Sequence, residues 1–80
     1  MEWFERVSAA VAEAAGSDPA SIAPSSTDIE TLLDVARIAA HDSGDRKNAP
    51  VLCYVLGLAR AGGATLEDLA AVVRGAAEQA

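Results

Sequence analysis

The sequence has little of the chemistry that builds metal sites and disulfides. It contains one cysteine, Cys53, and one histidine, His41. A lone cysteine cannot form a disulfide within the chain, and these two residues are too few to ligate a structural zinc ion. Cys53 also lies in an apolar run, which is typical of a buried thiol in a reducing compartment. We therefore expect no metal and no cofactor.

Basic residues are also scarce. Six lysines and arginines face twelve acidic residues, for a formal net charge of −6. Nucleic acids and anionic membrane surfaces both require concentrated positive charge, so we expect neither as a partner. The sequence begins with acidic rather than basic residues, and its longest apolar run, Val51 to Ala59, is too short to span a bilayer. These features predict a cytoplasmic protein.

The usual catalytic arrangements are missing as well. Cys53 has a single potential base, His41, and its apolar surroundings disfavour a thiolate. Gly62-Gly63 precedes a helix but lacks the lysine of a phosphate-binding loop. Asp42-Ser43-Gly44 ends a predicted helix, whereas the attachment serine of an acyl carrier begins one. We therefore expect a protein that is not an enzyme.

What is present is helix-forming sequence with few large apolar side chains. Eighty residues are enough for one domain, 1–80. The composition is 51% hydrophobic, but 19 of these residues are alanine. Alanine favours helix and adds little buried area. The core is therefore thin, and a chain this short buries only about 60% of the surface that its unfolded form exposes.

Apolar periodicity predicts an all-α fold, a compact bundle of four short helices at about 2–15, 28–43, 49–61 and 65–78. The serine- and proline-rich segment 17–26 is expected to be a loop, with Ile22 anchored in the core. For 51–59, which is apolar on every side, periodicity does not separate helix from strand. The proline before it and its leucine and alanine content favour helix.

Local signals suggest how these helices begin and pack. Thr27 and Glu30 have the spacing of a capping box, and Asn48 is suited to cap the third helix. Cys53, Gly57 and Ala61 form a stripe of small residues. We hypothesise that this stripe faces Ala36 and Ala40 of the second helix, so that the two helices cross closely.

Two groups of residues are candidates for binding. Arg37 and His41 share one helix face with Asp34, and Arg46 follows in the next turn, so Arg37, His41 and Arg46 form a candidate anion site. The structural alternative pairs Arg37 with Asp34 and places His41 at the helix end. The aromatic residues are candidates for contact with a partner protein, with core packing as the alternative for the first two: Trp3, Phe4 and Tyr54.

Three stretches of the chain resemble a known family: Leu33 to His41, Arg46 to Pro50, and Tyr54 to Ala59. They are similar to a small actinobacterial helical domain of unknown function that occurs alone or fused to molybdenum cofactor guanylyltransferase. The chain departs from the family pattern at Lys47 and at Val51-Leu52. The matching positions are Asp34, Ala36, Arg37, Ala40, His41, Arg46, Ala49, Pro50, Gly57 and Ala59.

The resemblance implies an association with molybdenum cofactor maturation and no particular activity. The leading hypothesis is a non-catalytic accessory or protein-interaction domain, with a molybdenum cofactor guanylyltransferase as a partner. The alternatives are a small-ligand or nucleotide-sensing module that uses Arg37, His41 and Arg46, and a self-associating structural protein that forms a homodimer.

Overall fold

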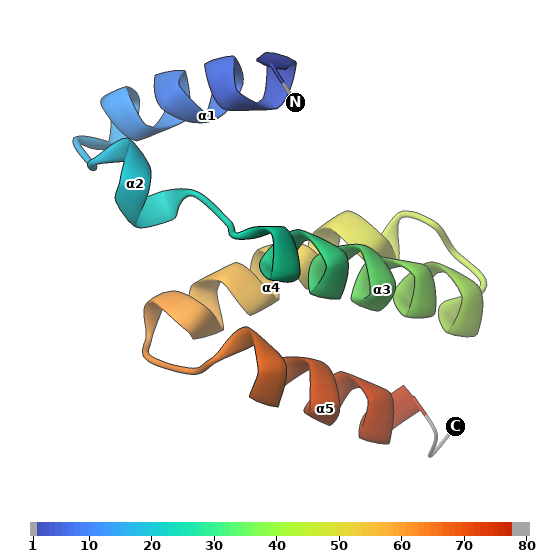
Figure 1. The fold of residues 1–80 in the computed structure, drawn as a ribbon. Helices are drawn as coiled ribbons and strands as arrows, with labels where there is room; N and C mark the ends of the chain where they lie inside the picture. Colours follow the sequence, from blue (N-terminus) through green and yellow to red (C-terminus); the bar gives the residue numbers. More distant parts are fainter. Residues whose placement is uncertain (1, 78–80) are drawn as a thin grey trace.

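The structure is a computed structural model, and it describes residues 2–77. Its regular elements there are all α-helices: α1 (Glu2–Ala15), α2 (Pro19–Ile22), α3 (Ser26–Ser43), α4 (Asn48–Ala61) and α5 (Leu66–Ala77) (Figure 1). The all-α prediction is confirmed, and the four long helices lie close to the predicted ranges. The strand alternative for 51–59 is wrong, because this segment forms α4. The predicted last residue of the fourth helix, 78, lies outside the described residues.

Helices α3, α4 and α5 pack on one another in an up-and-down order (Figure 1). The chain reverses direction twice, in the short connections 44–47 and 62–65. Short connections of this kind give antiparallel neighbours. Val35, Leu56, Leu66 and Ala70 are buried between the three helices, and half-buried residues surround them: Leu32, Leu52, Leu69 and Val73.

Helix α3 starts with a capping box, but not the predicted one. The Asp28 backbone N–H donates to Ser25 Oγ, and the Ser25 N–H donates to the Asp28 carboxylate. The donor–acceptor distance is 3.0 Å in both hydrogen bonds. The helix therefore begins at Ser26, two residues earlier than predicted, and the proposed Thr27–Glu30 box is wrong. The pairs Ser25–Asp28 and Thr27–Glu30 both have the spacing of a capping box. Ser25, directly after Pro24, has the extended backbone that an N-cap residue requires, so the helix begins with the first pair.

This cap gives a first testable prediction. Replacing Ser25 by alanine removes the acceptor for the Asp28 N–H, and we expect the free energy of unfolding to fall by about 1 kcal/mol. Thr27→Ala is the matched control, since Thr27 lies inside the helix, and we expect a change below about 0.5 kcal/mol. Urea unfolding followed by circular dichroism measures both. A larger loss for Thr27→Ala would contradict the observed cap.

The start of α4 also differs from the prediction. Asn48 belongs to the helix, and the N-cap position is taken by Lys47, which makes no side-chain capping bond. The Lys47 N–H instead donates to the carboxylate of Asp45 at a distance of 2.9 Å. The preceding turn is closed in this way by an acidic residue, and Pro50 lies in the first helical turn, where its missing N–H is tolerated.

The segment 17–26 is not only a loop. It contains α2, one helical turn that Asp18 caps by accepting from the Ala20 N–H. Proline at the first helical position suits such a start. The loop prediction, which was based on the serines and prolines of this segment, did not take into account that Asp18 followed by Pro19 can begin a helix. Ile22 is 44% exposed, so its predicted anchoring in the core is wrong. The reason is that α2 packs against α1, away from the core between α3, α4 and α5.

Helices α1 and α2 form a hairpin, residues 2–22, that we call the N-terminal arm. At the backbone level these two helices approach each other and not α3, α4 or α5 (Figure 1). Ala12 is fully buried within the arm, and its carbonyl accepts from the Ser17 N–H. The connection 23–25 joins the arm to α3. The arm contributes to the long dimension of a molecule that measures 40 × 25 × 20 Å.

The hypothesis of a close helix crossing at Gly57 is wrong. Gly57 is exposed, and a Cβ atom added to it would meet no atom within 4 Å. The side of α4 that faces the core carries Leu52 and Leu56 instead. Large side chains rather than small ones separate α3 from α4. Cys53, predicted to be buried, is only half-buried.

Two ion pairs connect α3 to the other core helices. Arg60 of α4 contacts Asp28 at 3.0 Å, and Arg74 of α5 contacts Asp34 at 2.9 Å. The Ser25 N–H, followed by the Arg60 guanidinium, holds the pKa of Asp28 below its usual value of 3.8. Hydrogen bonds from Arg74 and Arg37 lower the pKa of Asp34 in the same way.

These lowered pKa values predict a pH dependence of stability. A carboxylate whose pKa is lower in the folded state stabilises the fold above its unfolded value of 3.8, and this contribution is lost as pH falls through the folded value. We expect Asp28→Asn to destabilise the protein near neutral pH, and the difference from wild type to shrink as the pH falls below 3.8. Urea unfolding across this range tests the expectation. Glu30→Gln is the control, and an equal pH profile for both variants would contradict the role of Asp28.

Candidate interaction surfaces

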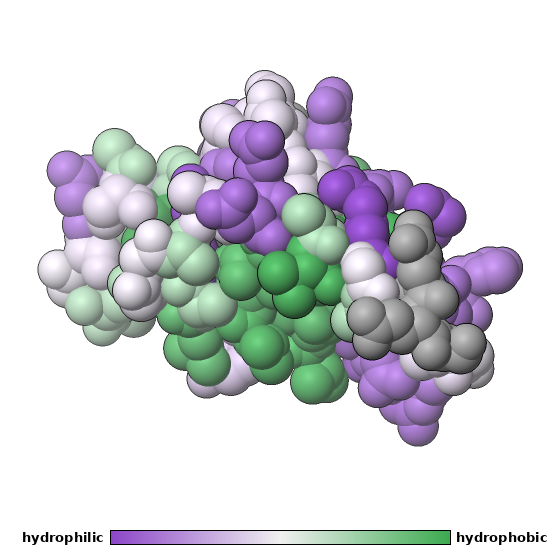
Figure 2. Space-filling model, turned by 90° about the horizontal axis from the view of Figure 1, so that it is seen from below, coloured by the Kyte–Doolittle hydropathy of each residue, from purple (hydrophilic) through white to green (hydrophobic). Residues whose placement is uncertain are grey.

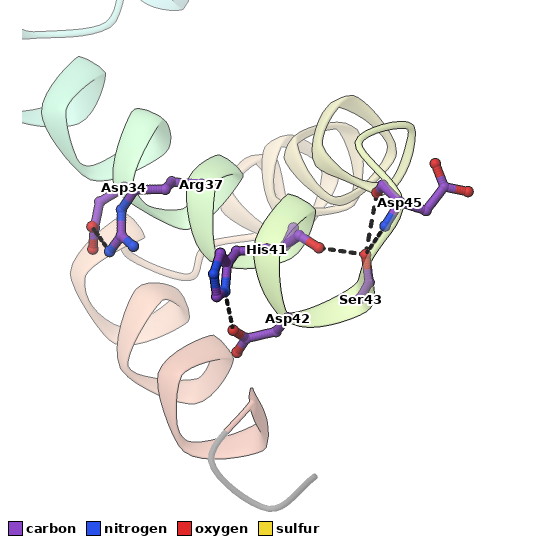
Figure 3. A network of polar contacts seen from close by, with 7 residues as sticks. Asp34, Arg37, His41, Asp42, Ser43 and Asp45 are labelled. Atoms are coloured by element: carbon purple, nitrogen blue, oxygen red, sulfur yellow. Dashed lines mark hydrogen bonds and ion pairs between the residues drawn. The ribbon is translucent and has the colours of Figure 1, made fainter.

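The three predicted anion-binding residues lie around the end of α3. The Arg37 guanidinium contacts Asp34 at 2.9 Å, and His41 Nδ1 lies 3.6 Å from the carboxylate of Asp42 (Figure 3). Arg46 lies in the turn before α4. Arg37 and His41 thus point to different carboxylates, which lie more than two helical turns apart on the same helix.

This arrangement disfavours an anion site. Asp34 receives both Arg37 and Arg74, so each guanidinium group already has a carboxylate partner, and the three groups together carry only one net positive charge. An anion approaching His41 would meet the negative charge of Asp42. Exposed pairs of this kind contribute little to stability and are common on helix surfaces. The structural alternative for Arg37, pairing with Asp34, is the one that the structure shows.

The turn after α3 is held by side-chain and backbone bonds. Ser43 Oγ donates to the carbonyl of Ala39 and accepts from the Asp45 N–H (Figure 3). Gly44 ends the helix with a φ of 73°, in the left-handed region that glycine adopts without strain. The polar residues that attract attention in the sequence of this turn therefore have local roles in terminating α3.

The three predicted partner-binding aromatics all lie at the surface. Trp3 is 65% exposed and Tyr54 is 68% exposed. Phe4 is 37% exposed and lines an open cleft of about 570 Å³ between the arm and α4, where Ile22, Cys53 and Gly57 also lie. The core-packing alternative fails for Trp3. For Phe4 the structure shows an intermediate position, turned toward the rest of the chain.

Helix α4 leaves apolar side chains uncovered on the side opposite its buried residue Leu56. The exposed residues recur at helical spacing: Val51, Tyr54, Val55 and Leu58. Residues three and four apart lie on one helix face, so these four form a continuous stripe. In the sequence, the only indication of this stripe is that the helix has no polar side. A helix that is apolar all round is normally buried on every side, and this one is not.

Part of the stripe borders a shallow, widely open apolar groove between α3, α4 and α5. Val51 and Val55 line this groove, which has a volume of about 480 Å³, whereas Tyr54 and Leu58 do not. We call it the three-helix groove, and its other apolar lining residues are Ile38, Ala39, Leu52, Val73, Ala76 and Ala77. Hydrophobic residues gather into one patch on the face shown in Figure 2.

Helix α1 has an uncovered apolar face as well. Its side toward α2 and the connection to α3 carries Phe4, Ser8 and Ala9, with the buried Ala12 one turn further on. Another apolar face of α1 lies about a quarter turn away, and it is exposed at Trp3, Val7 and Val11. The arm therefore folds without covering the most hydrophobic face of its longer helix.

The described residues 2–77 show no group of three side chains that could hold a metal ion, and no helix there is long and apolar enough to cross a membrane.

Comparison with known proteins gives one result. The model of the family described as a domain of unknown function, DUF6457, matches residues 1–80. Searches of curated proteins and of solved structures each find no match to this chain. The chain belongs to the DUF6457 family, whose function is unknown.

Proposed function

We propose that this chain is a non-catalytic accessory domain that binds another protein through the three-helix groove. We further propose that its partner is a molybdenum cofactor guanylyltransferase. The choice of partner is supported by the resemblance of residues 33–41 and 46–50 to the domain that occurs fused to that enzyme. The choice of an interaction role is supported by the distribution of apolar side chains.

The observation that carries the proposal is the imbalance between buried and exposed apolar residues. Among the described residues, only three buried hydrophobic side chains are larger than alanine, Val35, Leu56 and Leu66, whereas eleven large ones are exposed. Single exposed hydrophobic residues are normal on any protein. Residues that line up along helix faces form a patch, and patches of this kind mark binding surfaces.

The three-helix groove has the chemistry of a site for a polypeptide helix. Its lining is almost entirely apolar, with Asp42, Ser43 and Asn48 at one end. An amphipathic helix binds such a groove by inserting residues at positions i, i+3, i+4 and i+7. Polar groups at the rim then fix the direction of the bound helix, since they can pair with its terminal residues.

The polar residues of α3, together with Arg74 of α5, support a role without catalysis. Asp34, Arg37 and Arg74 form a chain of ion pairs, and Ser43 closes the turn after the helix. These ion pairs and hydrogen bonds account for the presence of a charged or hydroxyl side chain at each of these positions. A role in binding a substrate is not needed to explain them.

The experiment is a binding titration with the purified guanylyltransferase from the same source. We expect wild-type protein to bind it, and Val55→Glu to weaken binding at least about tenfold, because a charge enters the apolar groove. Leu33→Glu is the matched control, since Leu33 is 66% exposed on α3 and does not line the groove. Absence of binding by the wild type would overturn the choice of partner. Equal weakening by both variants would overturn the choice of surface.

A further inference from the structure

We propose that two copies of this chain form a twofold dimer in which α1 of each copy covers the outer face of α4 in the other. This outer face consists of Val51, Tyr54 and Leu58. The inference goes beyond the three-helix groove, because Tyr54, Leu58 and the exposed face of α1 lie outside it. We infer that a second copy of the chain covers the outer face of α4, and three observations support this choice.

The first observation is the excess of accessible surface. A folded monomer of 8.1 kDa exposes about 4,500 Å². This chain exposes 5884 Å². The excess is therefore about 1,400 Å² per chain. Covering half of it in each copy would bury about 1,400 Å² in total, within the range of stable protein–protein interfaces.

The second observation is that the chain presents two unpartnered apolar helix faces of similar length. From Val51 to Leu58 the α4 face extends about 10 Å, and from Trp3 to Val11 the α1 face extends about 12 Å. Within one chain these two faces do not cover each other, since α1 approaches only α2 at the backbone level. A single contact with a second copy would cover one face from each chain.

The third observation is the difference in charge between the two helices. Helix α1 carries three glutamates and one arginine, for a net charge of −2. Helix α4 has no acidic residue, and basic residues lie at both of its ends: Arg46, Lys47 and Arg60. At helical spacing these glutamates lie on the side of α1 away from Trp3, Val7 and Val11, and Arg60 is already paired with Asp28. The opposite charges of the two helices therefore attract only at long range, and this attraction reduces the general repulsion between two chains of charge −6.

Twofold symmetry makes the arrangement self-limiting. If α1 of the first copy covers α4 of the second, the same rotation places α1 of the second copy on α4 of the first. Both contacts form together, and no apolar face of this pair stays open for a third copy. The arm is suited to such a contact because its connection to α3, residues 23–25, is short and extended.

The test uses the full chain and its single tryptophan. Sedimentation equilibrium from about 1 µM to about 1 mM is expected to show a shift from one copy to two. Trp3, exposed in the single chain, becomes buried against the partner's α4, so its emission maximum should move to shorter wavelength over the same concentrations. We expect Leu58→Glu and Val11→Glu each to raise the dimer Kd about 30-fold or more, and Leu33→Glu to leave it unchanged.

Several outcomes would overturn the dimer. One is a single-copy mass throughout the concentration range. Another is a dimer that Leu58→Glu and Leu33→Glu weaken equally, because self-association would then use another surface. A third is a short-wavelength emission at single-copy mass, which would mean that α1 covers α4 of its own chain. Because Val51 lies on both surfaces, the guanylyltransferase titration is run at a concentration where the chain is a single copy, and Val55→Glu then tests the groove separately.

Discussion

Replacing Leu56 by alanine is expected to lower the free energy of unfolding by about 3 kcal/mol. Leu56 is 5% exposed and lies between α3, α4 and α5, where few other large side chains are buried. A domain of this length has a total stability of about 4 to 12 kcal/mol. The loss is therefore a large part of the total. Urea unfolding followed by circular dichroism at low protein concentration measures it.

Leu58 provides the control for this experiment. It lies on the same helix but is 58% exposed, and we expect Leu58→Ala to change stability by less than about 0.5 kcal/mol in the single chain. Low concentration keeps self-association out of the measurement. Similar losses for the two variants would mean that the core is not the one described between the three helices.

Replacing Gly57 by alanine is expected to stabilise the protein. Gly57 lies within α4, and a Cβ atom there meets nothing within 4 Å. Alanine is favoured over glycine in a helix interior by about 1 kcal/mol. Gly75 of α5 has the same free space, so the double variant should gain about 2 kcal/mol. Thermal unfolding would show this as a rise in Tm.

Gly44 tests whether the gain depends on backbone conformation. A Cβ atom at Gly44 also meets nothing within 4 Å, but its φ is 73°. Alanine is strained in the left-handed region, so we expect Gly44→Ala to lower stability by about 1 kcal/mol. A loss at Gly57 similar to that at Gly44 would indicate that α4 packs closely against a neighbour through its small residues, as the sequence had suggested.

The helices themselves were predictable because their signals are local. Apolar spacing located α1, α3 and α5, the preceding proline and the leucine and alanine content located α4, and glycine marked the end of α3 at Gly44. The exact start of α3 was not predictable, since Ser25 with Asp28 and Thr27 with Glu30 satisfy the same spacing rule. The choice between them depends on how the backbone leaves Pro24, which is a property of the folded chain.

The packing was predicted less well than the helices. Four helices of suitable length suggest that α1 belongs to the bundle, and its apolar stripe suggests the same. In the structure the arm turns back on itself at Gly16, and α2 takes the position beside α1. Alanine-rich faces cause the ambiguity, because an alanine such as Ala12 can be buried against almost any neighbour. Periodicity then identifies a face without identifying what covers it.

The candidate binding residues illustrate a similar limit. Arg37, His41 and Arg46 stand out because basic residues are rare in this sequence. Their partners could only be found in the structure, since Arg74 of α5 reaches Asp34 from forty positions away. The exposed stripe on α4 was visible as an apolar run. Sequence alone did not show that Leu56 would face the core and Leu58 would face away from it.

The separate packing of the N-terminal arm also affects the order in which the chain folds. During synthesis α1 and α2 leave the ribosome before any part of the three-helix core exists, and a helix of 14 residues is marginal in water on its own. The core depends on contacts between neighbouring helices, which form quickly once α5 has emerged. Helix α1 is therefore expected to gain lasting structure after α3, α4 and α5, and its amide hydrogens should exchange faster than those of these three helices.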